Sequence, residues 1–146
     1  IMKTLAIIGC GRIARNAHFP ALTKIDKVRI KYACDIIEEK AVAAKADFPK
    51  IENVITDYKV ALSDPEVDVV YVLTPNYAHY VVTMDALKAG KHVLCEKPLA
   101  MKMEDVSAIV AAAKKANKKF MVGQVCRCAP GFVKAKELVE SGRIKE

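Results

Sequence analysis

Short runs of β-branched and apolar residues alternate along the whole chain with longer segments that have helical spacing, and this alternation constrains the fold more than any other feature. Some runs, such as VDVVYVL at residues 67–73, are apolar on both faces. Strands of that kind belong to a parallel sheet that is covered by helices above and below. The sequence therefore predicts an α/β fold with a doubly wound parallel sheet and helices on both of its faces.

The pattern predicts six strands that alternate with six helices. The predicted strands span residues 4–8, 29–34, 54–55, 68–73, 92–95 and 120–125. The predicted helices span residues 12–24, 38–48, 59–62, 77–89, 103–117 and 131–141. Asn76 is placed to cap the N-terminus of the helix over 77–89, and Gly90 is placed to end it. With 146 residues, 53% of them hydrophobic, the chain has the size and core of one domain over residues 1–146.

Composition and charge argue against several classes of protein. No run of about 18 apolar residues occurs, and the N-terminus reaches a glycine turn too early for a signal peptide, so we expect a cytoplasmic protein without a membrane partner. The net charge is +7, but the lysines are spread over most predicted helices with few aromatics between them, which argues against nucleic acid. The five cysteines, mostly within or beside apolar runs, indicate small buried hydrophobes in a reducing compartment. Cys126 and Cys128 lack further ligands after them, so no metal is expected.

The first predicted strand runs into GCGRIA, residues 9–14, a glycine-rich turn that opens the first helix. Gly9 permits the tight turn, Gly11 lets the backbone approach a pyrophosphate, and Ala14 is small enough for close contact between helix and strand. The phosphates would then lie at a helix N-terminus, where free N–H groups and the helix dipole favour anions. In this context the turn predicts a dinucleotide-binding domain of the Rossmann type.

Asp35 ends the second predicted strand, 26 residues after Gly9. A carboxylate there can accept hydrogen bonds from the adenosine ribose hydroxyls and would repel a 2′-phosphate, so NAD is favoured over NADP. An ordinary turn residue is the alternative interpretation of Asp35. Arg12, inside the glycine turn, could pair with a diphosphate or with a 2′-phosphate, which weakens the preference for NAD. S-adenosylmethionine-dependent methyltransferases share the glycine-rich turn and the acid, and remain a competing class at this point.

Three motifs in order resemble the Gfo/Idh/MocA family, nicotinamide-dependent oxidoreductases of the glucose-fructose oxidoreductase and inositol dehydrogenase type. They are GCGRIA, TPNYAH at residues 74–79 and CEKP at residues 95–98. The similarity covers essentially the whole chain, including RCAPGFVKAKELVESGRIKE at its end. The resemblance implies hydride transfer between NAD(H) and a sugar, a cyclitol or a related hydroxyl or carbonyl substrate.

The resemblance also implies roles for individual residues. The implied cofactor contacts are Gly9, Gly11, Arg12, Ile13, Asp35, Thr74, Pro75, Asn76, His79, Glu96 and Lys97. Lys97 also matches the lysine that the family places beside the nicotinamide and the substrate hydroxyl, and is the expected catalytic residue. For His79 the alternative is a histidine on the helix surface. The resemblance further implies that the peptide bond between Lys97 and Pro98 is cis.

The chemistry of a lysine fits that implied place. An ammonium group at the mouth of the sheet can donate to a substrate oxygen and stabilise the negative charge that develops there as hydride moves. Neighbouring residues on a strand point to opposite faces, so we expect Glu96 and Lys97 not to point the same way, and they need not form a salt bridge with each other. Pro98 then stops the strand just past the lysine.

The sequence ends at Glu146, where the family pattern leads us to expect a second domain to begin. In the family a second α/β domain supplies most substrate contacts, a proton-transferring histidine and often the surface for homo-oligomers. We therefore expect residues 1–146 to be a cofactor-binding domain that binds NAD(H) without turnover, with its last helix partly exposed. The alternatives are a complete, non-enzymatic dinucleotide-binding regulatory module and the methyltransferase-like domain.

Overall fold

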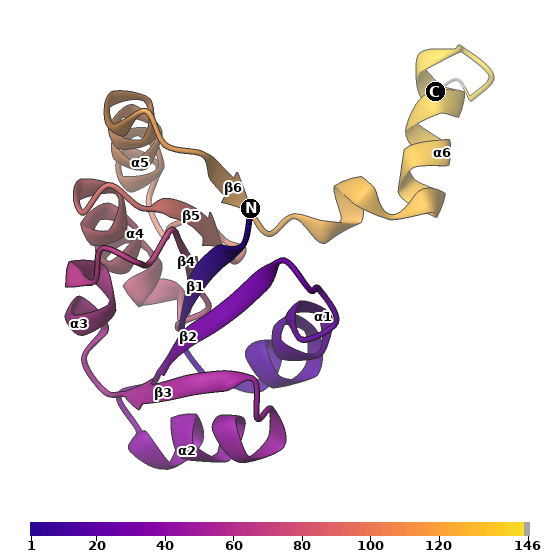
Figure 1. Ribbon diagram of the computed structural model, residues 1–146. Helices are drawn as coiled ribbons and strands as arrows, with labels where there is room; N and C mark the ends of the chain where they lie inside the picture. Colours follow the sequence, from indigo (N-terminus) through magenta and orange to yellow (C-terminus); the bar gives the residue numbers. More distant parts are fainter. Residues whose placement is uncertain (145–146) are drawn as a thin grey trace.

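The computed structural model describes residues 1–144 and contains a six-stranded parallel sheet with helices on both faces (Figure 1). The strands are β1 (Lys3–Ile8), β2 (Val28–Cys34), β3 (Ile51–Ile55), β4 (Val69–Val72), β5 (His92–Cys95) and β6 (Phe120–Val122). Their order in the sheet is β3-β2-β1-β4-β5-β6, and every neighbouring pair is parallel. The strand order reverses between β1 and β4, which is the defining feature of the Rossmann fold and confirms the predicted fold class.

The helical segments alternate with the strands as predicted. They are η1 (Ala14–His18), α1 (Phe19–Leu22), α2 (Glu38–Asp47), α3 (Tyr58–Ser63), η2 (Asn76–Ala78), α4 (His79–Lys88), α5 (Met103–Ala116), η3 (Val125–Cys128) and α6 (Pro130–Glu140). Helices α1 and α2 lie on one face of the sheet, and α3, α4 and α5 lie on the other (Figure 1).

Two buried clusters fill the spaces between the sheet and its helices. On one face, Val70 and Val72 of β4 pack with Leu87 of α4 and Ile109 of α5. On the other face, the cluster of β1, β2 and the α1 and α2 helices is closed by Phe19, whose ring stacks on Phe48 at a centroid distance of 5.3 Å. Both faces of the central strands are therefore covered, as their apolar sequences predict.

The helix predicted over residues 12–24 is interrupted. Its first part is the π-helical turn η1, in which the Phe19 N–H donates to the carbonyl of Ala14, five residues back. Pro20 follows and has no N–H with which to continue the α-helical pattern to the carbonyl of Asn16. The chain resumes as the short helix α1 and ends after Leu22.

Two other boundaries differ from the prediction. The strand predicted to reach Val125 ends at Val122, because the Gln124 N–H turns back to donate to the Val122 carbonyl at 2.8 Å, and Val125 begins η3. The predicted cap at Asn76 is wrong: Pro75 is the N-cap residue of η2, and its carbonyl accepts the Ala78 N–H at 2.9 Å without a side-chain cap. The predicted stop at Gly90 is confirmed, since Gly90 has φ +72°.

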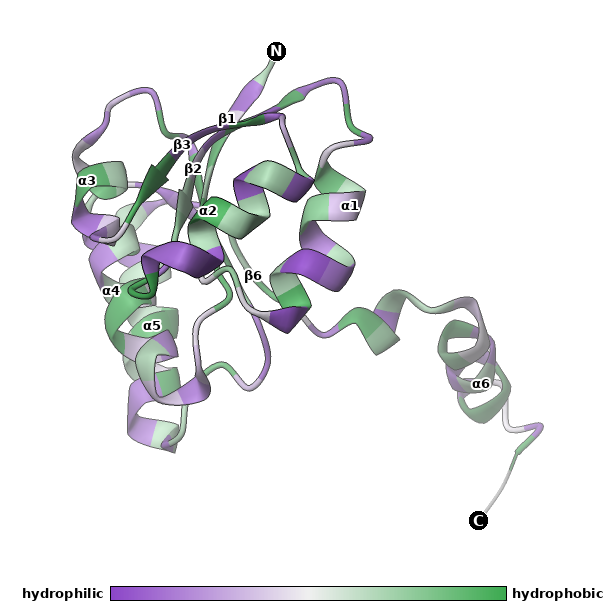
Figure 2. Cartoon of the chain, turned by 90° about the horizontal axis from the view of Figure 1, so that it is seen from below, coloured by the Kyte–Doolittle hydropathy of each residue, from purple (hydrophilic) through white to green (hydrophobic). Residues whose placement is uncertain are grey.

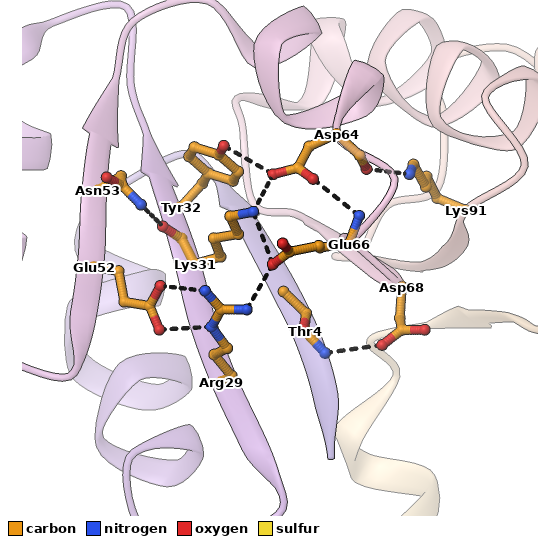
Figure 3. A network of polar contacts seen from close by, with 10 residues as sticks. All are labelled: Thr4, Arg29, Lys31, Tyr32, Glu52, Asn53, Asp64, Glu66, Asp68 and Lys91. Carbon is orange, nitrogen blue, oxygen red and sulfur yellow. Dashed lines mark hydrogen bonds and ion pairs between the residues drawn. The ribbon is translucent and has the colours of Figure 1, made fainter. Parts of the chain in front are cut away.

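A network of charged residues ties the amino ends of the strands together (Figure 3). Arg29 of β2 makes a two-pronged contact with Glu52 of β3, at 2.7 and 2.8 Å, and a third hydrogen bond with Glu66 at 2.7 Å. Lys31 pairs with both Asp64 and Glu66, in the loop between α3 and β4. This network lies at the edge of the sheet opposite to the ends of the strands that carry the glycine turn and Asp35.

The carboxyl group of Asp64 makes the stability contributed by this network depend on pH. The hydrogen bond from Lys31 lowers the pKa of Asp64 from 3.8 to about 2, and the Glu66 N–H also favours the carboxylate. A lowered pKa in the folded state stabilises the fold above the unfolded pKa, and that stabilisation is lost as the pH falls from about 4 towards 2.

We therefore expect Asp64→Asn to lower the urea midpoint of unfolding at pH 7, and the difference from the unsubstituted chain to shrink as the pH falls from about 4 towards 2. Urea titrations followed by circular dichroism at several pH values measure this. The matched control is Asp26→Asn, because Asp26 is exposed and forms no ion pair among residues 1–144. A difference for Asp64→Asn that is constant across this range would contradict the linkage.

The last helix, α6, extends away from the body of the domain (Figure 1). It has no buried residue, and its apolar side chains Phe132, Val133 and Val139 are exposed by 63%, 41% and 56%. Figure 2 shows hydrophobic segments of α6 lying clear of the sheet. The prediction that this helix leaves part of its apolar face exposed is confirmed. None of the helices within residues 1–144 is long and apolar enough to span a membrane.

Candidate functional site

The carboxyl ends of four neighbouring strands bring the predicted site residues to one edge of the sheet. Gly9 follows β1, Asp35 follows β2, Thr74 follows the end of β4, and Glu96 and Lys97 follow β5. Because the strands are parallel and the strand order reverses between β1 and β4, a crevice opens at this edge. Two cavities lie there, and Thr74 lines both of them.

The first cavity, which we call the Asp35 cavity, lies over the ends of β1 and β2. It is lined by Ile8, Gly9, Cys34, Asp35, Ile36, Thr56, Tyr58, Thr74, Pro75, Tyr77, Ala78 and Val82. Most of these groups are apolar, and Asp35 is the only charged residue among them. No lysine or arginine within residues 1–144 lines this cavity.

The Asp35 carboxylate braces the glycine turn from inside the cavity. Its Oδ2 accepts the Cys10 N–H at 2.9 Å, and its Oδ1 accepts the Ile37 N–H at 3.0 Å. Asp35 therefore stabilises the turn through backbone hydrogen bonds, as in the alternative interpretation of an ordinary turn residue. It also lines the cavity. A carboxylate has about four acceptor positions, so two of them are left for a ligand.

The two glycines of the turn have different structural requirements. Gly9 has φ +102°, and a Cβ added to it would lie 2.5 Å from the carbonyl oxygen of Leu73. The tight turn predicted at Gly9 is therefore confirmed, because only glycine fits both the backbone conformation and the approach of β4. A Cβ added at Gly11 would meet nothing within 4 Å, so within the protein the space beside Gly11 is open.

The second cavity, which we call the Lys97 cavity, lies between the first helical turn and the end of β5. It is lined by Arg12, Ile13, Asn16, Thr74, Asn76, His79, Glu96 and Lys97. Seven of these eight residues were predicted from the sequence. Asn16 was not, although it lies one helical turn after Arg12 and that spacing could have indicated it. Arg12 lines this cavity and not the Asp35 cavity.

Glu96 is buried, and its carboxylate contacts two neighbouring residues. Its Oε1 lies 2.9 Å from Nε2 of His18, and its Oε2 accepts the Lys97 N–H at 3.1 Å. A Cβ added at Gly123 would lie 3.1–3.2 Å from the Glu96 carboxyl group. A larger residue at this position would therefore crowd the carboxylate. The sequence analysis missed His18, because contact between residues 78 positions apart leaves no spacing pattern in the sequence.

The expected orientation of Glu96 and Lys97 is wrong in one respect. Both residues line the Lys97 cavity, because β5 ends at Cys95 and the alternation of a strand no longer applies to the two residues after it. The ion pair of Glu96 in the structure is with His18. The Lys97–Pro98 peptide bond is cis, as the family resemblance implied.

His79 is the first residue of α4 and is only 1% exposed, so the alternative of a surface histidine is wrong. Its Nδ1 lies 2.6 Å from the carbonyl oxygen of Pro98, and its Nε2 lies 2.8 Å from the carbonyl oxygen of Thr74. Both ring nitrogens are therefore engaged within the protein. Near it, the hydroxyl of Thr74 is shielded and has no hydrogen-bond partner among residues 1–144.

The cysteines offer no nucleophile at this edge. Burial raises the pKa of the Cys10 and Cys34 thiols to about 12 and that of Cys95 to about 11, so they stay protonated near neutral pH. The prediction of small buried hydrophobes is confirmed for these three and wrong for Cys126 and Cys128, which are exposed. Among residues 1–144, no group of three or more histidine, cysteine, aspartate or glutamate side chains could hold a metal ion.

Comparison with known proteins identifies the family. The model of the Gfo/Idh/MocA oxidoreductase family, NAD-binding Rossmann fold, matches residues 3–124. The chain belongs to this family. The methyltransferase alternative is therefore wrong.

Relatives within the Gfo/Idh/MocA family are much longer than this chain. Inositol 2-dehydrogenase/D-chiro-inositol 3-dehydrogenase of Lactiplantibacillus plantarum is 35% identical over 142 residues, which are 96% of this chain and 40% of that protein. The crystal structure of scyllo-inositol dehydrogenase from Lactobacillus casei, with bound NAD(H) and scyllo-inositol, matches with a TM-score of 0.89 and 26% identity over 100% of this chain and 43% of that one. KijD10, a 3-ketoreductase from Actinomadura kijaniata solved with NADP and TDP-benzene, matches with a TM-score of 0.90 and 27% identity, over 100% and 44% of the two chains.

Proposed function

We propose that this chain is the NAD(H)-binding domain of a longer Gfo/Idh/MocA dehydrogenase that transfers hydride between the nicotinamide and a sugar, a cyclitol or a related hydroxyl or carbonyl substrate. The chain spans about 40% of the curated relatives that it matches, which supports a substrate domain elsewhere in the protein. Inositol dehydrogenases among the relatives support the substrate class. Homo-oligomerisation of the longer protein stays a prediction.

The adenosine half of the cofactor is assigned to the Asp35 cavity. Its apolar lining suits an adenine ring, and Ile36, which is 83% exposed beside Asp35, offers a side chain for the ring to cover. The two free acceptor positions of the Asp35 carboxylate suit the ribose hydroxyls. Gly9 and Gly11 lead from this cavity to the start of η1, where the pyrophosphate would meet free backbone N–H groups.

The nicotinamide half is assigned to the Lys97 cavity. When bound, NAD(H) supplies the hydride chemistry. The Lys97 ammonium would donate to the substrate oxygen and stabilise the charge that develops on it during transfer. Thr74, whose hydroxyl has no hydrogen-bond partner in the described part of the chain, lines both cavities and would contact the middle of the cofactor.

The observation that carries the choice of NAD over NADP is the charge of the Asp35 cavity. Its lining has one carboxylate and no cation, so a 2′-phosphate there would face Asp35 without a compensating partner. The relatives include proteins solved with NAD(H) and with NADP, so family membership alone leaves the cofactor open.

We expect NADH to bind this chain more tightly than NADPH in a fluorescence titration, and Asp35→Ala to narrow the gap. Removing the carboxylate removes both the ribose contact and the repulsion of the 2′-phosphate, which together contribute about 1.4–2.8 kcal/mol, so the ratio of the two affinities should fall by about 10- to 100-fold. Asp26→Ala is the control, because Asp26 is exposed and does not line this cavity. Equal or reversed affinities in the unsubstituted chain would refute the assignment of Asp35.

The proposal that the chain is part of a longer enzyme has its own test. The coding sequence after the codon for Glu146 should continue in frame into a second domain, and the 146-residue chain should bind NADH without oxidising or reducing cyclitols. A stop codon at that point would instead support a complete, non-enzymatic dinucleotide-binding module.

A further inference from the structure

We infer that His18 is a positioning residue for Lys97, and that it acts through the carboxyl group of Glu96. Three groups form this link: the His18 ring, the Glu96 carboxyl group and the backbone N–H of Lys97. The link itself belongs to the domain alone. Its effect on catalysis deepens the proposed function and rests on it.

The two oxygens of Glu96 join the first helical turn to the backbone of the lysine. Oε1 lies 2.9 Å from Nε2 of His18, and Oε2 accepts the Lys97 N–H at 3.1 Å. The contact with the ring needs one hydrogen between the two groups, whichever of them carries it. A single carboxyl group therefore contacts η1 with one oxygen and the peptide unit that leads into Lys97 with the other.

The Glu96 carboxyl group has little room to move. The side chains of His18 and Glu96 are only 15% and 10% exposed, and a Cβ added at Gly123 would lie 3.1 Å from the carboxyl carbon. The backbone is held as well, because the Glu96 N–H donates to the Val72 carbonyl at 3.0 Å. Among residues 1–144, His18 is the only side chain that hydrogen-bonds to this carboxyl group, so its loss should release one of the two oxygens.

The place of His18 is set by the π-helical turn and by Tyr71. In η1 the Phe19 N–H donates to the carbonyl of Ala14, five residues back, which brings these two residues to the same buried face of the turn. His18 directly precedes Phe19. Its ring packs edge-on against Tyr71 of β4, at a centroid distance of 5.6 Å and an interplanar angle of 87°. The ring is therefore fixed by packing before it contacts Glu96.

The link matters for Lys97 because the lysine follows the end of its strand. Its side chain is exposed, and its N–H bonds to the Glu96 side chain rather than to a neighbouring strand. Without His18, the Glu96 carboxyl group is free to turn and to release that N–H. The ammonium group, at the end of a long side chain, would then start from a less fixed backbone. A displacement of about 1 Å in a reacting group costs about 100-fold in rate.

The first experiment uses the 146-residue chain and needs no cofactor. We expect His18→Phe, which keeps an aromatic ring beside Tyr71 and removes the hydrogen bond, to accelerate hydrogen exchange of the Lys97 amide by about 10-fold. Exchange followed by ¹H–¹⁵N NMR measures this. The Val93 amide, which donates to the Lys119 carbonyl at 3.0 Å within the sheet, is the internal control and should exchange as before.

A conservative variant separates the hydrogen bond from other effects of the substitution. The side-chain amide of glutamine places a nitrogen about as far from the backbone as Nε2 of histidine. His18→Gln should therefore restore most of the protection of the Lys97 amide. An unchanged exchange rate of that amide in His18→Phe would overturn the link, whether or not the chain binds NADH.

The second experiment tests positioning in the full-length enzyme. We expect His18→Phe to lower kcat by about 10- to 100-fold while the NADH dissociation constant stays within about threefold, because a displaced lysine costs rate and not cofactor affinity. His18→Gln should recover most of the loss. His92→Phe is the matched control: it also removes a histidine that contacts a backbone N–H, at the other end of β5, and should leave kcat unchanged.

A double substitution tests whether His18 acts through Glu96. Glu96→Ala removes the carboxyl group, which is the partner in both contacts of the link. Adding His18→Phe to Glu96→Ala should then lower kcat by less than about a further threefold, because the link is already broken. A further loss as large as that of His18→Phe alone would show that the two residues act independently and would overturn the inference.

Failure of the inference and failure of the proposed function give different results. Unchanged kcat in His18→Phe would overturn the positioning role, and NADH affinity weakened as strongly as kcat would replace it with a role in cofactor binding. An unsubstituted enzyme that neither binds NADH nor turns over cyclitols or sugars would refute the proposed function, while the exchange of the Lys97 amide would still test the link. If His18→Phe does not fold, His18→Leu, with a smaller apolar side chain, takes its place in each experiment.

Discussion

Lys97→Met should lower kcat of the full-length enzyme by about 10²–10³-fold, because it removes the one group proposed to stabilise charge on the substrate oxygen. The dissociation constant for NADH should change little, since the adenosine half is held in the Asp35 cavity by other residues. Methionine keeps much of the length and apolar character of the lysine stem and removes the ammonium. Steady-state kinetics with a cyclitol or sugar substrate, together with an NADH titration, measure both quantities.

The matched control for this prediction is Lys102→Met. Lys102 is an exposed lysine that precedes α5 and lines neither cavity, so its loss removes the same charge without touching the site. It should leave kcat unchanged. Near-normal turnover in Lys97→Met would remove the catalytic role of Lys97, and an equal loss in both variants would point to net charge as the cause.

Gly9→Ala should destabilise the fold by about 3 kcal/mol or more. The residue has φ +102°, a conformation that costs an L-residue energy, and its new methyl group would lie 2.5 Å from the Leu73 carbonyl oxygen. That oxygen belongs to the backbone at the end of β4, where the Leu73 N–H is already bonded to Ile8 at 2.7 Å, so it has little freedom to move. Urea unfolding of the 146-residue chain measures the loss.

Gly11→Ala separates stability from cofactor binding. Its added methyl group meets nothing within 4 Å, so the unfolding free energy should change by less than about 1 kcal/mol. The same methyl group would occupy the space through which the backbone is proposed to approach the pyrophosphate, and NADH affinity should fall. The two substitutions should therefore have different effects: Gly9→Ala lowers the stability of the fold, and Gly11→Ala lowers NADH affinity. A Gly9→Ala chain as stable as the unsubstituted one would contradict the turn geometry.

The alternation of strands and helices was readable from the sequence because it follows from burial on both faces of a parallel sheet. β5 matches its predicted bounds of residues 92–95, and the other five predicted strands agree in place to within three residues at each end. The sequence analysis did not predict the interruption of the helix at η1. The spacing of apolar residues carries no information about the backbone N–H that Pro20 lacks. The end of β6 depends on a local turn at Gln124 that leaves no apolar signature.

The candidate site was predictable to the extent that it is local. The residues just after β1, β4 and β5 are each marked by a short motif, and the fold brings them to one edge because parallel strands end together. What escaped prediction is the contact between distant segments. His18 reaches Glu96 across 78 positions, and the burial of His79 depends on the carbonyl of Pro98, 19 positions away. Such pairs follow from the completed fold and not from spacing along the chain.

The projecting helix α6 has a practical consequence for protein engineering. Neither of the two core clusters within residues 1–144 includes a residue of α6, and the family match ends at residue 124. Trimming the chain after η3 (Val125–Cys128) would therefore discard exposed Phe132, Val133 and Val139 while the cores and both cavities keep their residues. The result would be a shorter domain without the exposed apolar side chains of α6, and therefore less prone to associate through them.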